Sequence, residues 1–199
     1  AQVDTLVSIS DATLRSAATV EIHLKSGGVD ALSLALPDGV DVLSLAGPSL
    51  RTHEVIDDPA GGQRIDVQFT QEMEGQFRLD VVYEQIMDDA SAEVIVPTVS
   101  VPGAEVEQGR VAVEALSAVE VQASTVEQLS SLDVAELPQQ LVLRTTNPLL
   151  LAYKYVQADE PAQLGLTITR HREIDVQGAT IDRAEYRTLA SGVRPRGTV

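Results

Sequence analysis

The sequence predicts an all-β protein, a large antiparallel β-sandwich built as a single domain over residues 1–199. Apolar and polar residues alternate with a period of two through much of the chain, which is typical of strands with one buried face. Glycine, proline and acidic residues interrupt this alternation at short intervals, as they do between the strands of sandwiches. No helical pattern alternates with the strands, so a parallel βαβ sheet is not expected.

The first half of the chain opens with an apolar segment at 3–9 and a clearly alternating strand at 19–25. Ser26-Gly27-Gly28 follows, and the alternation resumes at 29–36. Paired glycines adopt positive φ at low cost, so these residues predict a hairpin that brings the two strands together. The next predicted strands are 40–46, 64–70, 76–84 and 92–96.

The second half predicts strands at 110–116, 118–123, 140–144, 149–156, 163–170 and 183–189. At most one short helix is expected, near 124–131. Ser124 precedes Glu127 by the spacing of a capping box, and Val126 and Leu129 have near-helical spacing. Prolines stand at the ends of most strands, where a missing N–H group is tolerated.

The weakest composition break lies at 101–109 and marks a soft waist that would divide the domain into two sheet-rich halves. The segment 12–29 also has a partial echo at 179–193, since both place an Ala-Thr-aliphatic step before a strand ending at Ser-Gly. Residues 179–199 therefore either form a terminal strand or begin a next repeat.

Two apolar ladders face each other across Pro37-Asp38-Gly39 in the segment 31–47. They could line a ligand groove or form the core. Burial of each such side chain is worth roughly 1.5–3 kcal/mol, and no polar residue of the segment converges to orient a ligand. We interpret the ladders as core, and we expect no small-molecule ligand for this chain.

The charge balance excludes several classes of partner. The chain carries 30 acidic and 14 basic residues, a net charge of -16. Such a field repels nucleic acid and anionic lipid. Cysteine is absent, which excludes disulfides and thiolate chemistry. No apolar run reaches the roughly 18 residues of a membrane span, so direct membrane insertion is not expected.

Catalytic and cofactor motifs are missing. His23, His53 and His171 lack metal-ligand spacing. Neither Gly-x-Ser-x-Gly nor a phosphate-binding glycine loop occurs. We therefore expect no enzyme activity and no cofactor.

Asp88, Asp89 and Glu93 are the candidate metal ligands, because calcium binds clusters of oxygen atoms in loops between strands. The alternative is a solvated acidic turn. A glycan-acting enzyme would need two carboxylates across a cleft. Sugar sites also favour aromatic platforms, and the aromatic content is 3%. Tyr153 and Tyr155 share a strand face and are expected to pack in the core.

Several stretches resemble a repeated β-rich module of large bacterial cell-envelope or membrane-anchored proteins of unknown function. The resemblance rests on "GGVDALSLALPDGVDVLSLAGPSLRTHEV", "QFRLDVVYEQ", "EVIVPTVSVPGAEVEQGRVAVEA", "LLAYKY" and "HREIDVQGATIDRAEYRTL". It implies a modular, non-enzymatic and extracytoplasmic part, either periplasmic or on the cell surface, and it supplies no catalytic residue.

We therefore expect a non-catalytic structural or protein-interaction module of the bacterial cell envelope. Its partner would be another protein or a neighbouring copy that adds a strand to a free sheet edge. The alternatives are a carbohydrate- or calcium-binding β-sandwich and, with less support, a glycan-acting enzyme with paired carboxylates.

Overall fold

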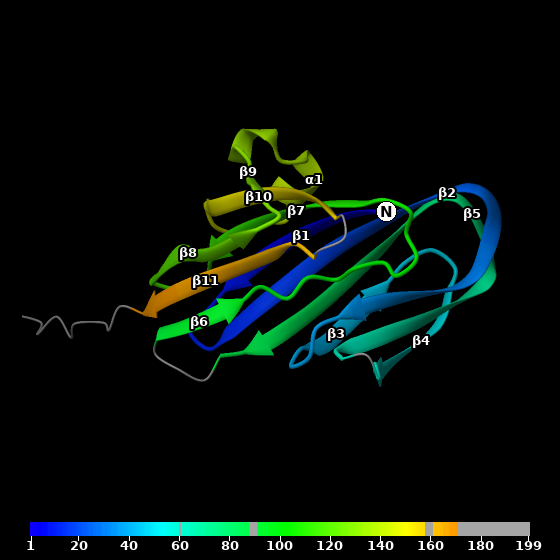
Figure 1. Ribbon diagram of the computed structural model, residues 1–199, viewed down its shortest axis with the longest axis horizontal. Helices are drawn as coiled ribbons and strands as arrows, with labels where there is room; N and C mark the ends of the chain where they lie inside the picture. The colour runs from blue at the N-terminus through cyan, green and yellow to red at the C-terminus, as the bar shows by residue number, and fades with distance from the viewer. Residues whose placement is uncertain (60, 88–90, 158–160, 171–199) are drawn as a thin grey trace, which may run out of the picture.

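The computed structural model describes residues 1–59, 61–87, 91–157 and 161–170, and it confirms an all-β sandwich (Figure 1). The predicted strand 183–189 and the segment 179–199 lie outside the described residues. The strands are β1 (Gln2–Ile9), β2 (Thr13–Leu36), β3 (Asp41–Ala46), β4 (Leu50–Asp57), β5 (Gln63–Ile86), β6 (Ser91–Ile95), β7 (Glu107–Ala115), β8 (Val119–Glu127), β9 (Ser130–Ser131), β10 (Leu149–Gln157) and β11 (Gln163–Arg170).

The predicted hairpin at Ser26-Gly27-Gly28 is wrong. β2 continues through these residues and pairs along its length with β5, with register shifts between His23 and Gly28 and between Val29 and Ala31. Gly27 has a φ of 73° and Gly75, opposite in β5, has a φ of 66°. Glycines on both strands thus permit a bend of the two-stranded ribbon, where Figure 1 shows β2 and β5 curling together and running back.

The bend still brings the predicted strands 19–25 and 29–36 together, as layers of one core rather than as hydrogen-bonded neighbours. Val20 and Ile22 pack in the same buried cluster as Leu34 and Leu36. Leu34 is 0% exposed. Val40 and Leu45 of the second ladder belong to the same cluster, so the interpretation of 31–47 as core is confirmed for these residues, whereas Leu43 is 46% exposed.

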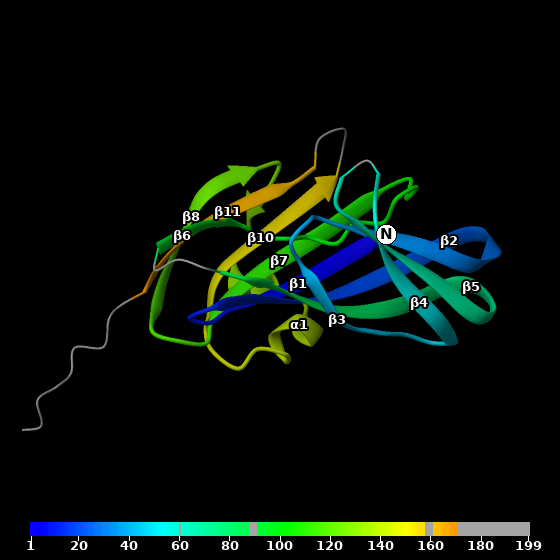
Figure 2. The ribbon, with the colours of Figure 1, turned by 90° about the horizontal axis from the view of Figure 1, so that it is seen from below.

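The main sheet has the order β3-β5-β2-β1-β7-β10-β9, and β4 also pairs with β5. Figure 2 shows β1, β7 and β10 side by side in its middle. One feature departs from the predicted antiparallel sandwich, because β1 and β7 are parallel. β1 is buried at Val3, Leu6 and Val7, and it needs neighbours on both edges as a central strand. β2 covers one edge and β7 the other.

A second sheet, in the order β6-β11-β8, lies over β1, β7 and β10. The cluster between the two sheets includes Val7, Val111, Val113, Leu164 and Leu166. Residues 96–101 lead from β6 to the ribbon, where Ser100 and Ala35 exchange backbone hydrogen bonds of 2.9 Å. Of the predicted waist at 101–109, residues 101–106 connect to β7 and residues 107–109 belong to β7.

The predicted helix near 124–131 is wrong. Ser124 and Glu127 belong to β8, whose Val119 and Val121 pack on the core between the sheets. The helical turns come later, at η1 (Val134–Glu136), capped by Asp133, and at α1 (Gln139–Val142). The predicted strand 140–144 is therefore also wrong. Leu137 and Leu141 cover Leu6, Ala112 and Ala152 on the other face of the main sheet.

Among the described residues, none of the helices has the length and apolar composition to cross a membrane.

Candidate functional site

Glu114 is a buried acid that holds a loop in place. Its side chain is on β7 and is 1% exposed. One carboxylate oxygen, Oε2, accepts hydrogen bonds of 2.9 Å from the backbone N–H groups of Thr146 and Asn147, and Oε1 accepts one of 2.7 Å from the Ser8 hydroxyl. All of these bonds are internal, so this acid fixes the loop before β10 to β1 and β7.

Glu107, at the start of β7, is a second buried acid that accepts a hydrogen bond from a loop. Its Oε2 accepts a 2.7 Å hydrogen bond from the Val101 N–H, and the Tyr155 hydroxyl lies 3.5 Å from its Oε1. Burial raises the pKa of the Glu107 carboxyl above its ordinary value, although the Val101 hydrogen bond opposes this. Burial, together with the Glu107 charge, also raises the pKa of the Tyr155 phenol.

The tyrosines lie where core packing was expected. Tyr153 is 9% and Tyr155 is 6% exposed. The ring of Tyr155 fills the space above Gly109, its direct partner on β7, where a Cβ atom would meet both this ring and the Val3 carbonyl oxygen. The glycine therefore allows a bulky ring to lie across the strand.

The structure does not test the predicted metal ligands, because Asp88 and Asp89 lie outside the described residues. The Glu93 side chain is exposed on β6. In the part of the chain that the structure describes, no group of three or more His, Asp or Glu side chains could hold a metal ion. His23 and His53 are exposed, and His171 lies outside the described residues.

Sequence patterns did not single out the polar rows on the outer face of the main sheet. Asp4 on β1, Arg110 on β7 and Lys154 on β10 are direct cross-strand partners. The next row consists of Gln2, Gln108 and Val156. These rows lie on the face of the main sheet that η1 and α1 cover. Leu6, Ala112 and Ala152, which contact the helical turns, are each two residues from a member of the first row and therefore point to the same side.

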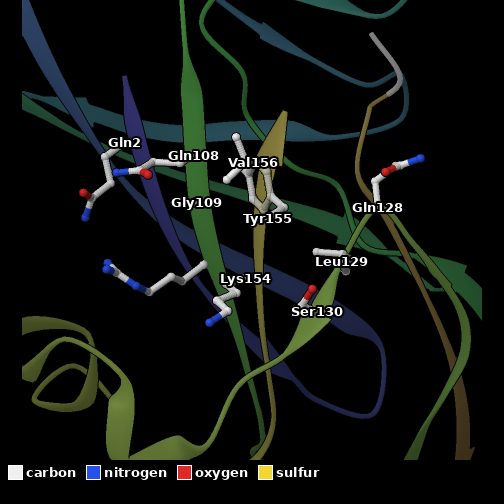
Figure 3. A pocket seen from close by; sticks show the side chains of 10 residues that line it. Gln2, Gln108, Gly109, Gln128, Leu129, Ser130, Lys154, Tyr155 and Val156 are labelled. Atoms are coloured by element: carbon white, nitrogen blue, oxygen red, sulfur yellow. The ribbon is translucent and has the colours of Figure 1, made fainter. Parts of the chain in front are cut away.

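These rows border a hollow of about 500 Å³, shown in Figure 3. Its lining residues are Gln2, Gln108, Gly109, Arg110, Gln128, Leu129, Ser130, Lys154, Tyr155 and Val156. Ser130 belongs to the two-residue strand β9, which pairs with β10 only at Tyr153 and Lys154. Two cations and a row of amides thus lie around one opening.

A second surface feature is the edge of the smaller sheet. Among the described residues, β8 pairs with β11 alone, over its length from Val119 to Glu127. A bulge at Ser124 leaves 119–123 as an unbroken stretch. No lysine or proline occurs in β8, although both residue types commonly protect free edges.

No protein-family model and no curated protein sequence matches this chain. Among solved structures, an M1 zinc metallopeptidase from Deinococcus radiodurans is similar at 11% identity with a TM-score of 0.45, over 84% of this chain and 41% of the peptidase. A substrate-bound mutant of that peptidase matches at 12% identity with a TM-score of 0.47, over 84% and 41% of the two chains.

Native leukotriene A4 hydrolase from Saccharomyces cerevisiae matches at 12% identity with a TM-score of 0.44, over 83% of this chain and 28% of the hydrolase. This chain spans less than half the length of each of these proteins. Similarity at this level identifies neither the family nor the activity of this chain.

Proposed function

We propose that this chain is a non-catalytic protein-interaction module of the bacterial cell envelope. It binds an extended segment of another protein along β8. The observation that carries the proposal is that one edge of this nine-residue strand has no partner strand in the part of the chain that the structure describes. A free edge presents unpaired N–H and C=O groups, which an added strand satisfies.

Hydrogen bonding in the smaller sheet indicates which groups are free. The Leu164 carbonyl oxygen accepts a 2.8 Å hydrogen bond from the Val96 N–H. Backbone groups alternate sides along an antiparallel strand, so residues 163, 165, 167 and 169 of β11 face β8. Their partners are Glu127, Thr125, Gln122 and Glu120. The N–H groups of Val121 and Ala123 therefore point toward the free edge.

Charge favours a basic partner. The exposed side chains of β8 include Glu120, Gln122 and Glu127, and the whole chain carries a net charge of -16. A second copy with the same charge is repelled at long range, whereas a segment carrying Lys or Arg is attracted. The occupant that fits is thus an extended, lysine- or arginine-bearing segment of a different protein.

The other edges offer less to a partner strand. β9 has 2 residues, β6 has 5 and β3 has 6. β4 has 8 residues but lies between Pro48 and Pro59. Short edge strands and nearby prolines are common protections against edge pairing. β8 is therefore the preferred site for strand addition.

The use of the buried acids supports a non-catalytic role. The carboxylates of Glu107 and Glu114 accept hydrogen bonds from backbone N–H groups of adjacent loops. The envelope location rests on the sequence resemblance alone. Fractionation of the native cells tests it, with recovery in the envelope or periplasm expected and recovery in the cytoplasm contradicting it.

The binding experiment uses a nine-residue peptide of alternating valine and lysine, titrated into the ¹⁵N-labelled protein. We expect saturable chemical-shift changes centred on the amides of Val121 and Ala123. Ala123→Pro should abolish them without unfolding the protein, because its missing N–H lies on the free edge. Ala123→Ser, which keeps the N–H, should bind like the wild type.

Three outcomes oppose the proposal. An absence of shifts on β8 would overturn strand addition. Equal binding of an alternating valine–glutamate peptide would overturn the charge argument. Dimerisation in sedimentation that is lost in Ala123→Pro would replace the basic partner with a second copy. Gln122→Pro serves as the control for the assigned hydrogen bonds, because it should weaken the fold itself.

A further inference from the structure

Arg110 and Lys154 form a like-charge pair at the centre of the outer face. They are direct cross-strand partners on β7 and β10, so their Cβ atoms lie about 5 Å apart. Like charges placed directly opposite each other destabilise a sheet unless an anion lies between them. This pair is notable in a chain with 30 acidic and 14 basic residues.

The chain itself supplies only part of the negative charge that this pair requires. Asp4 accepts hydrogen bonds of 3.1 and 3.3 Å from Nη1 of Arg110. Among the described residues, Lys154 has no acidic partner, and Nε and Nη2 of Arg110 have no hydrogen-bond acceptor. None of the residues that line the adjacent hollow is acidic.

The neighbouring polar groups are suited to hydroxyls. Gln2 and Gln108 stand side by side in the next row, and Ser130 stands beside Lys154 at the far side of the hollow. Figure 3 shows these four side chains around one opening. Amide and hydroxyl groups both donate and accept hydrogen bonds, as sugar hydroxyls do. Leu129 and the 63%-exposed Val156 add apolar surface.

We propose that this hollow binds a sugar acid. The carboxylate lies between Lys154 and the free nitrogens of Arg110, and the hydroxyls meet Gln2, Gln108 and Ser130. The volume of about 500 Å³ accommodates a monosaccharide or a short oligosaccharide. A sugar ligand corresponds to the carbohydrate-binding alternative that the sequence left open, whereas the main expectation included no small-molecule ligand. The hollow lies next to the end of β8, because Gln128 and Leu129 directly follow that strand.

The net charge of the chain also limits how much negative charge the ligand can carry. A chain of charge -16 repels a long polyanion, while screening over about 8 Å at physiological salt leaves the local Arg110–Lys154 field effective. The favoured ligand is therefore singly charged. An acidic side chain of a protein would satisfy the two cations, but it has no hydroxyls for the row of amides.

The test compares three probes by calorimetry and NMR: methyl glucuronide, neutral methyl glucoside and N-acetylglutamate. We expect saturable binding of the glucuronide with shifts at Arg110, Lys154 and Ser130, and binding at least about tenfold weaker for the other two probes. Lys154→Met should weaken glucuronide binding by about tenfold or more, and Lys154→Arg should restore most of it.

Lys25→Met is the matched control, since it removes an equally charged, exposed side chain that pairs with Glu105 elsewhere. Any of three results would overturn the proposal. The first is an absence of glucuronide binding at millimolar concentration, and the second is an affinity for the glucoside equal to that for the glucuronide. The third is a loss of glucuronide binding in Lys25→Met equal to that in Lys154→Met. Equal affinity for N-acetylglutamate would instead identify a site for acidic protein side chains and overturn the sugar assignment.

Discussion

Glu107 and Glu114 differ from the other described acidic side chains because both are at least 95% buried, with exposed fractions of 5% and 1%. Buried carboxylates need several hydrogen bonds to offset the loss of hydration. Glu114 receives them from two backbone N–H groups and from the hydroxyls of Ser8 and Thr146, whereas Glu107 receives one short bond and one long one. The two acids should therefore respond differently to substitution.

Removal of the Glu114 carboxylate should strongly destabilise the fold. Glu114→Ala leaves the N–H groups of Thr146 and Asn147 unpaired, and a cost of about 3–5 kcal/mol in the free energy of unfolding is expected. Glu114→Gln keeps one oxygen for these N–H groups and can donate to the Ser8 hydroxyl, so it should cost less than half as much. Urea denaturation checks both values, and equal losses would contradict this assignment.

Glu107 should make the stability depend on pH. The native pKa lies above the ordinary value of 4.5, so the native state holds a proton that the unfolded chain has released. The stabilisation that protonated Glu107 gives to the native state is complete below a pH of about 4.5, and it is lost as the pH rises through the native pKa.

Glu107→Gln removes this titration while preserving the acceptor for Val101. The free energy of unfolding of the variant minus that of the wild type should therefore increase with pH across that window. Denaturation curves at a series of pH values provide the measurement. Parallel curves, or a difference of opposite slope, would contradict the raised pKa.

At the scale of elements, the alternating stretches 19–25, 64–70, 76–84 and 163–170 were predictable, because each buries one face. The unbroken strands β2 and β5 were not, since a glycine pair permits a bulge as well as a turn. β4 was missed because most of its side chains are exposed and no periodic burial marks it. The capping-box residues near 124 do not form a helix, because core packing by Val119 and Val121 favours a strand there.

The pairing of β7 with β10 depends on Gly109. A Cβ atom there would collide with the Val3 carbonyl oxygen and the Tyr155 ring. Gly109→Ala should therefore destabilise the protein by about 1–3 kcal/mol, as overpacking commonly does. Thermal denaturation measures the change. Tyr155→Leu in the same background should restore only part of it, because the contact with the β1 backbone remains, and a fully neutral Gly109→Ala would contradict the close approach.

At the scale of the molecule, the two candidate surfaces come from topology. The row from Asp4 to Lys154 exists because β1 and β7, more than 100 residues apart, are parallel neighbours, and local sequence patterns carry no signal for such a pairing. The acidic candidates Asp88, Asp89 and Glu93 drew attention because acidic residues are dense in that stretch, whereas the polar hollow is built around cations.

We propose that β8, whose outer edge has no partner strand among the described residues, binds a basic, extended segment of another protein. Residue-resolved amide exchange tests it most directly. In the protein alone, the amides of Val121 and Ala123 should exchange quickly, while those of Glu120 and Gln122 are protected by β11. Saturation with the valine–lysine peptide should slow exchange at Val121 and Ala123. Protection of these two amides before the peptide is added, or no added protection at saturation, would contradict the claim.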